Sequence, residues 1–122
     1  VKDPRGLAPA GYHVPTYTEW NSLIIFLGDV DVAGGKMKEM GITNWLSPNE
    51  GATNSSSFTG LPGGNRSFNG SFDSISYNGC WWSSTEYTIN NAWLRLLFNN
   101  NTRSSWGSSR KTNGFSVRCI KD

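Results

Sequence analysis

The stretch Asn90–Phe115, with the sequence NNAWLRLLFNNNTRSSWGSSRKTNGF, decides which kind of sheet this protein builds. Alternation along AWLRLLF divides the side chains into an odd-numbered set, Trp93, Arg95 and Leu97, and an even-numbered set, Leu94, Leu96 and Phe98. A strand with one buried face normally alternates apolar with polar residues, but here both sets are partly apolar. The strand is therefore either covered on both sides or left with an apolar patch in solvent.

Composition limits both the fold and the classes of function. A chain of 122 residues is long enough for one domain with a real core. Hydrophobic residues make up only 36%, but aromatic residues reach 13%, and 14 Gly with 5 Pro predict a loop-rich fold pinned by large rings. The net charge of +2, with both signs scattered, provides no basic stripe for nucleic acid. No apolar run is long enough for insertion into a membrane.

Two helices are predicted in the first third of the chain. Residues 1–15 read as loop with one short strand, after which Thr16 and Glu19 have the spacing of a capping box. The apolar residues that follow recur on one helical face: Trp20, Leu23, Ile24 and Leu27. Gly28 then ends this helix. A shorter helix is predicted over residues 32–40, VAGGKMKEM, with Met37 and Met40 turned inward and Lys36, Lys38 and Glu39 in solvent.

The remainder of the chain predicts a long ordered loop followed by strands. From Gly41 to Asn78 the sequence is rich in Gly, Ser, Asn and Pro, and single large residues are expected to anchor it: Trp45, Phe58, Leu61, Phe68 and Phe72. A loop of this length is unusual and itself points to function. Strands are predicted over CWWSST (80–85), AWLRLLF (92–98) and GFSVRCI (114–120). The predicted fold class is therefore α+β, with an antiparallel sheet.

Few residues could carry metal or nucleophilic chemistry. Cys80 and Cys119 are too far apart for a compact zinc motif, and His13 is the single histidine, so we predict no metal and no cofactor. The string SPNE (47–50) has no second acidic set beside it for calcium. The cysteines are either disulfide-bonded or, as we favour, small buried residues in strands. His13 is expected to be a structural imidazole, and with no paired carboxylates in view we predict no enzymatic activity.

Seven motifs carry a resemblance to a known family. They are APAGYHVPTYTEWNSLI, GGKMKEMG, GATNSSSFTGLPGGNRS, GSF, WWSSTE, NNAWLRLLFNN and KTNGFSVRC. Together and in this order they resemble the Fibrobacter succinogenes major paralogous domain, found in surface and secreted proteins of Bacteroidetes-type bacteria. The resemblance implies a C-type lectin-like fold close to the formylglycine-generating-enzyme variant, with two helices on a small twisted antiparallel sheet. Residues 1–122 would then be one C-type lectin-like ligand-binding domain with long ordered loops.

The C-terminal frame WWSSTE…NNAW…GFSVRC also resembles the variable proteins of diversity-generating retroelements. In those proteins, asparagine codons of a template are rewritten through their adenines into a restricted set of residues. The positions here that belong to this set are Tyr87, Thr88, Ile89, Leu94, Leu96, Phe98, Asn99, Arg103, Ser105, Gly107, Ser108 and Arg110. Trp106 and Lys111 lie outside the set, so they are predicted to be fixed or to come from other codons.

These observations predict a non-enzymatic adhesion or receptor-recognition domain with a diversified binding face. The odd-numbered set would face inward, with Arg95 bound to Glu86 or to backbone carbonyls, and the even-numbered set would face out. The predicted ligand-binding residues are Tyr87, Ile89, Leu94, Leu96, Phe98, Asn99, Arg103, Ser105, Trp106, Ser108 and Arg110. In the alternative arrangement, the Gly41–Asn78 loop covers the even-numbered set.

The resemblance also sets expectations for partners and location. The ligand would be a protein or glycan on another cell, and the domain would form part of a larger assembly at a bacterial surface, a pilus tip or a phage particle. Two other functions stay open: a structural module of a larger secreted protein, and a degenerate formylglycine-generating-enzyme-like domain.

Overall fold

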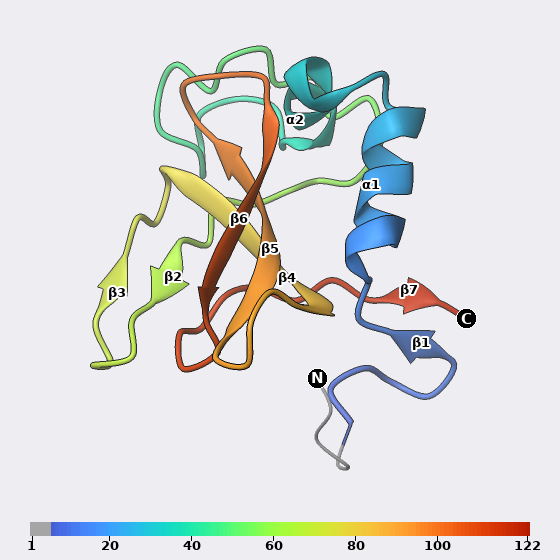
Figure 1. The fold of residues 1–122 in the computed structure, drawn as a ribbon. Coiled ribbons are helices and arrows are strands. Elements are labelled where there is room, and N and C mark those ends of the chain that lie inside the picture. The colour runs from blue at the N-terminus through green and yellow to red at the C-terminus, as the bar shows by residue number, and fades with distance from the viewer. Residues whose placement is uncertain (1–5) are drawn as a thin grey trace.

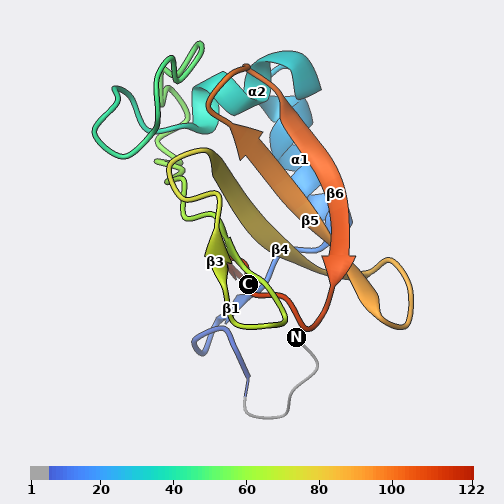
Figure 2. The same cartoon turned by 90° about the vertical axis from the view of Figure 1, so that its left-hand side faces the viewer.

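A computed structural model describes residues 6–122 and shows a three-stranded antiparallel sheet with two helices on one side (Figure 1). The elements are β1 (Tyr12–His13), α1 (Tyr17–Phe26), α2 (Val30–Met37), β2 (Asn65–Arg66), β3 (Phe72–Asp73), β4 (Asn78–Glu86), β5 (Asn91–Phe98), β6 (Ser104–Arg110) and β7 (Ile120–Lys121). The β2–β3 hairpin lies on the side of the sheet opposite the helices (Figure 2). The predicted α+β class is confirmed, while the loop predicted at residues 1–5 lies outside the described part.

The main sheet has the order β4–β5–β6, so the strand AWLRLLF lies at its centre. β5 pairs with β4 with a register shift after Trp82, and with β6 in one unbroken register from Asn91↔Arg110 to Leu97↔Ser104. The strands predicted over residues 80–85 and 92–98 are confirmed. Because paired residues share a face, this register determines which side chains meet above and below the sheet.

The third strand of the sheet is β6. The prediction of a strand over GFSVRCI is therefore wrong. Residues 114–119 form only isolated bridges, from Gly114 to Arg66 and from Ser116 to Trp81, before Ile120 begins β7. The β6 sequence SSWGSSR has no apolar alternation. Its extended conformation therefore comes from its ladder with β5 rather than from its own composition.

The first helix follows the prediction closely. Thr16 is the N-cap of α1: its Oγ1 accepts from the Glu19 amide, and the Glu19 carboxylate accepts from the Thr16 amide at 2.8 Å. This capping box satisfies backbone donors that the first helical turn would otherwise leave unpaired. The C-cap is Leu27, and Gly28 follows with φ of 122°. The predicted apolar face faces the core.

The second helix begins and ends earlier than predicted. Asp29 caps it by accepting from the amides of Asp31 and Val32, and it ends at Met37. Its two central glycines are required by close packing: a Cβ on Gly34 would overlap the carbonyl oxygen of Arg103, and a Cβ on Gly35 would overlap the carbonyl oxygen of Gly51. Glycine lowers helix propensity, but here it lets α2 lie directly against the β5–β6 turn.

The burial of Lys38 and Met40 is the reverse of what the sequence predicted. The chain is extended at Lys38, with φ −70° and ψ 141°, so helical spacing no longer applies after Met37. Met37 is buried as predicted, but Met40 is exposed and Lys38 is 0% exposed. Lys36 and Glu39, predicted to be solvated, are half-buried.

The buried Lys38 ammonium joins three segments of the chain. Its Nζ donates to the carbonyl oxygens of Glu50 at 2.8 Å, Phe98 at 2.9 Å and Asn101 at 2.9 Å. Three donors therefore meet three backbone acceptors from the long loop, the end of β5 and the β5–β6 turn. Burial lowers the pKa of Lys38 to about 8, so the group is charged at neutral pH.

The core lies between the helices and one face of the sheet. It consists of Trp20, Ile24, Leu27, Ala33, Met37, Trp45, Trp81 and Leu97, with Leu23, Phe58 and Trp106 packed against it. Trp45 and Phe58 thus anchor the Gly41–Asn78 loop as predicted, and Trp45 Nε1 also donates to Gly60 O at 2.9 Å. The other predicted anchors are exposed: Leu61, Phe68 and Phe72.

The two ends of the described chain meet in the β1–β7 pair beside the start of α1 (Figure 1). His13 links them, because its Nδ1 lies 2.6 Å from Asp122 Oδ1 and its Nε2 lies 2.8 Å from Glu19 Oε1. The imidazole therefore has structural partners, as expected. Both partners are carboxylates, which the sequence did not place beside it. Both cysteines are free: Cys80 is buried in β4, and Cys119 is half-buried just before β7.

Candidate functional site

The even-numbered set of β5 does not form an exposed patch. Leu94 is 3% exposed, and Leu96 and Phe98 are half-buried, so the predicted exposure of Leu94 is wrong. These side chains face away from the helices, where Trp82 is the cross-strand partner of Leu94. The Trp82 ring also packs edge-on against Phe115, with 4.7 Å between centroids. The C-terminal segment thus helps to cover this side of the sheet.

Packing on this side leaves little room for change. Gly107 is opposite Leu94 in β6, and a Cβ at Gly107 would lie 2.9 Å from Leu96 Cδ1. A contact this short is not seen between real side chains, so Leu96 would have to move. Gly107 belongs to the set of predicted variable positions, and a side chain there requires the Leu96 side chain to shift.

The odd-numbered set faces the helices, as predicted. Arg95 is 0% exposed; its Nη1 donates to Ser104 O at 2.9 Å and its Nη2 to Asn21 Oδ1 at 3.2 Å. A backbone carbonyl is thus one of its partners, as expected. Its guanidinium also lies 3.8 Å from the ring centroid of Trp106. Burial lowers the pKa of Arg95 to about 10, so the guanidinium is charged at neutral pH where it lies over the Trp106 ring.

Three other predicted site residues have structural positions apart from one another. Asn99 is buried and its Nδ2 donates to Ser47 O at 3.1 Å. Arg103 lies at the β5–β6 turn, and its Nη1 forms an ion pair of 2.8 Å with Asp31 in the first turn of α2. Ser105 is half-buried beside Leu96. The predicted residues therefore do not make one continuous face.

Four aromatic rings meet on the helix side of the sheet, where α1 begins. We call this group the aromatic platform, and its members are Tyr17, Tyr87, Trp93 and Trp106. Tyr17 stacks on Trp106 with centroids 4.0 Å apart and planes 13° apart. Trp93 contacts the other three rings, at 4.6 Å from Tyr87, 5.2 Å from Tyr17 and 5.8 Å from Trp106. Ring pairs at such distances are mutually stabilising, so the platform is rigid.

The platform is partly open to solvent. Tyr87 is 52% exposed, the other three rings are half-buried, and the nearby loop residue Ile89 is 85% exposed. Ser108 is the cross-strand partner of Trp93, and Arg110 lies two residues further along β6; both are exposed. The structure thus brings together Tyr87, Trp106, Ser108 and Arg110 from the predicted residues, with Ile89 on the adjoining loop.

Hydrogen bonds hold the loop that carries Tyr87 and Ile89. The Tyr87 amide donates to Asn91 O at 2.9 Å, which closes the β4–β5 connection. Lys111 reaches across from the end of β6, and its Nζ donates to Ile89 O at 2.9 Å and to Glu86 Oε1 at 2.8 Å. Lys111 was predicted to be fixed or to come from another codon, and these hydrogen bonds give it a structural role. A loop held in this way loses little entropy when it binds a ligand.

Sequence reasoning missed two members of the platform. Tyr17 is the first residue of α1 and reaches Trp93 only because β4 and α1 pack together, with the Tyr17 amide donating to Thr85 Oγ1 at 2.9 Å. Trp93 belongs to the inward set, but α1 begins at Tyr17, so no earlier helical turn covers the Trp93 ring. The position of Tyr17 directly after the N-cap does not predict its contact with Trp93. The position of Trp93 near the end of a strand does indicate a ring that is only partly buried.

Side chains that could ligate a metal ion are dispersed in the described residues. No group of three or more His, Cys, Asp or Glu within residues 6–122 could hold a metal ion. Burial raises the pKa of the Cys80 thiol to about 11, which keeps it protonated and a poor nucleophile. Among the same residues, no helix has the length and apolar character needed to span a membrane.

Fold and surface together define a small α+β domain with a rigid, half-exposed aromatic platform at one corner of its sheet. Residues 1–121 match the model of the Fibrobacter succinogenes major domain, and the chain belongs to this family. No curated protein and no solved structure matches the chain.

Proposed function

We propose that this domain is a non-enzymatic binding module and that the aromatic platform is its recognition surface. The observation that carries the proposal is the contact of three aromatic rings, one of them the half-exposed Tyr87, with Trp93, beside a hydrogen-bonded loop. Protein surfaces used for recognition combine rigid aromatic area with short polar side chains that adapt their hydrogen bonds. Ile89, Ser108 and Arg110 supply such a border here.

Covering the exposed part of Tyr87 would contribute favourably to the binding of a ligand. An aromatic side chain buries roughly 200 Å² in an interface, so covering the exposed half of Tyr87 removes about 100 Å² from water. At about 25 cal/mol per Å² this is about 2.5 kcal/mol from one ring, before the entropy of association is subtracted. Because Tyr87 and its loop are already ordered, little of that gain is lost. A protein or glycan ligand on another cell suits this mixed apolar and polar surface.

The finer classification belongs to the same proposal. We place the fold with the C-type lectin-like domains, on the resemblance of the sequence motifs and on the arrangement of two helices against a small antiparallel sheet. The family resemblance supports a place at a bacterial surface, a pilus tip or a phage particle, within a larger assembly. If the C-terminal frame is diversified, the variable positions are the exposed ones: Tyr87, Thr88, Ile89, Arg103, Ser108 and Arg110.

The chain offers a matched control for the binding test. Tyr77 is 53% exposed and Ile75 is 72% exposed, and both lie in the connection between β3 and β4, away from the platform. The test variant is Tyr87→Ala with Ile89→Ser, and the control is Tyr77→Ala with Ile75→Ser. Both pairs remove the same chemical groups from the surface.

Fluorescently labelled domain is applied to a glycan array and to an array of surface proteins from cells that share its habitat. We expect at least one saturable ligand whose binding falls tenfold or more in the Tyr87/Ile89 variant and is unchanged in the control. Equal losses in both variants would place recognition elsewhere, and no saturable ligand for the wild type would remove the proposal.

A structural module is the second candidate, favoured by exposed apolar side chains outside the platform. Ile25 and Phe26 at the end of α1 are both exposed, as is Phe72 on the β2–β3 hairpin. Neighbouring domains of a larger protein would cover such side chains. Limited proteolysis and hydrogen exchange of the larger protein distinguish the two functions. Protection confined to Ile25 and Phe26, with the platform unprotected, agrees with a binding module inside a larger assembly.

A further inference from the structure

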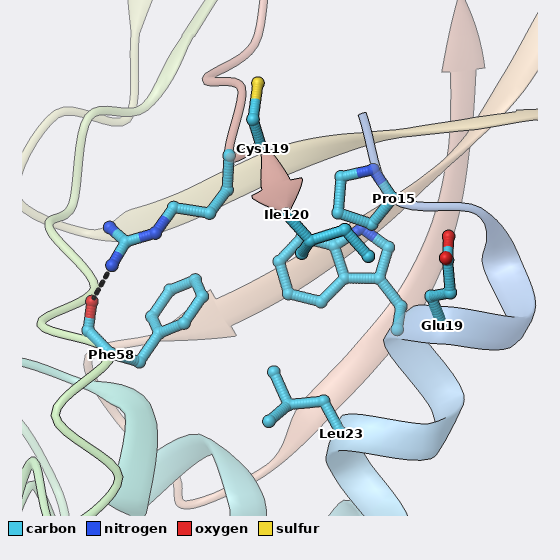
Figure 3. A pocket seen from close by; sticks show the side chains of 8 residues that line it. Pro15, Glu19, Leu23, Phe58, Cys119 and Ile120 are labelled. Carbon is cyan, nitrogen blue, oxygen red and sulfur yellow. Dashed lines mark hydrogen bonds between the residues drawn. The ribbon is translucent and has the colours of Figure 1, made fainter. Parts of the chain in front are cut away.

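A pocket of about 220 Å³ opens between α1, the Phe58 loop and the residues that lead into β7 (Figure 3). Its apolar lining comes from Trp20, Leu23, Phe58 and Ile120. The platform residue Tyr17 is three positions before Trp20, but it does not line this pocket. The pocket is therefore a separate site from the platform.

Two charged side chains line the pocket, and only one of them is already paired. Glu19 Oε2 accepts from the Thr16 amide at 2.8 Å, and Oε1 lies 2.8 Å from His13 Nε2. Arg118 gives one hydrogen bond, from Nη2 to Phe58 O at 2.9 Å (dashed in Figure 3), and has no ion pair within residues 6–122. A guanidinium has five N–H donors, so most of those on Arg118 remain for an anion.

The wall that carries Phe58 is held in a strained conformation. Ser57 has φ of 57° and Thr59 has φ of 51°, and a β-branched residue with positive φ is rare. The Asn54 amide clamps Thr59, accepting from its backbone N–H at 2.8 Å and donating to its Oγ1 at 3.0 Å. Between these two residues, the Phe58 ring lies 4.5 Å from the Arg118 guanidinium. Strain kept in place by specific hydrogen bonds is typical of ligand sites.

We propose that this pocket binds a small apolar carboxylate. The apolar part lies against Trp20, Leu23 and Ile120, and the carboxylate pairs with Arg118 at the edge. Because the pocket is smaller than the roughly 300–1,000 Å³ of most ligand sites, it accommodates one ring or one branched chain. A free organic acid and the carboxyl end of a peptide share this chemistry. Cys119 also lines the pocket, and its thiol points away from Phe58 and Leu23 in Figure 3.

The first test compares neutral and anionic probes on the unaltered protein. Isotope-labelled domain is titrated with 3-phenylpropionate and with 3-phenylpropan-1-ol, while NMR follows the Trp20 indole N–H and the Ile120 methyl groups. We expect saturable shifts with the acid and at least tenfold weaker binding of the alcohol. Equal affinities would show that Arg118 does not select an anion, and the absence of saturable shifts with the acid would show that there is no site.

The second test uses Arg118→Gln, with Arg66→Gln as a control that removes an exposed arginine of β2 whose guanidinium also lies over a phenylalanine ring, that of Phe72. Acid binding is expected to weaken tenfold or more in the first variant and to stay unchanged in the second. Equal behaviour of the two variants overturns the proposal. If Arg118→Gln fails to fold, the acid–alcohol comparison decides alone. A pentapeptide ending in leucine and its C-terminal amide then identify the source: tighter binding of the free-carboxyl peptide than of the free acid indicates a chain end, and weaker binding indicates a free acid.

Discussion

Replacing the buried lysine, Lys38→Met, tests how the irregular half of this fold is held together. The Lys38 ammonium is fully buried, and its hydrogen-bond partners are the backbone carbonyls of Glu50, Phe98 and Asn101. Methionine has nearly the same length and keeps the apolar stem packed, so the substitution removes the charge and the three donors with little change of volume.

The expected loss follows from what remains behind. A buried carbonyl without a donor costs about 1–3 kcal/mol, and three are affected at once. Part of this is offset, because a buried ammonium carries a desolvation cost of several kcal/mol that the variant no longer has. We therefore expect a net loss of about 2–4 kcal/mol, a large fraction of the roughly 5–15 kcal/mol that stabilises a typical domain. The carbonyls belong to the backbone, so no compensating substitution can remove them.

Urea unfolding at pH 6.5 measures this difference, since Lys38 with its pKa of about 8 is then charged. Lys36→Met is the control: Lys36 lies in α2 and makes a single hydrogen bond, to Leu27 O at 2.6 Å. Its loss should stay near 1 kcal/mol. A Lys38→Met variant within about 0.5 kcal/mol of wild type, which is roughly the error of such measurements, would refute the reasoning that Lys38 holds these segments together.

Three further predictions concern stability. The pKa of His13 is raised by its hydrogen bonds to Asp122 and Glu19, so its stabilising effect is full below about pH 6.5 and is lost as the pH rises through the raised value. In urea unfolding, the difference in unfolding free energy between wild type and His13→Gln should be larger at pH 5.5 than at pH 8.5. A difference independent of pH would contradict this. Gly34→Ala should destabilise by more than about 2 kcal/mol because its Cβ would overlap a backbone oxygen, whereas a stabilised variant would mean that helix propensity prevails. Thr16→Ala should cost about 1 kcal/mol through loss of the N-cap, measured as a lower melting temperature, and no change would mean that the cap is dispensable.

Variation in natural populations tests the diversification hypothesis against the structure. Substitutions should gather at the exposed positions Tyr87, Ile89 and Ser108, while Leu94 stays constant because it is buried. Deep sequencing of the coding region measures this directly. Variation at Leu94 as frequent as at Tyr87 would show that burial does not constrain the strand.

Local sequence features determined the parts of the fold that depend on neighbours along the chain. The capping box of Thr16 and Glu19 and the helical spacing of Trp20 and Ile24 predicted α1 because their hydrogen bonds and contacts lie within one or two turns. The alternation in AWLRLLF likewise identified the central strand and the inward position of Arg95. The family follows from motifs that extend over the same chain.

Only the tertiary structure decided which side chains are buried where the chain is irregular, and which surface is available. Lys38 reads as a solvated helical residue until three distant carbonyls surround it, and β6 reads as a loop until seven consecutive pairs join it to β5. Leu94 was expected outside, but Trp82 and Phe115 close over that side of the sheet. The platform forms because the start of α1 packs against the sheet and brings Tyr17 to Trp106. Contacts between residues so far apart in sequence leave no periodic pattern, so sequence alone does not reveal them.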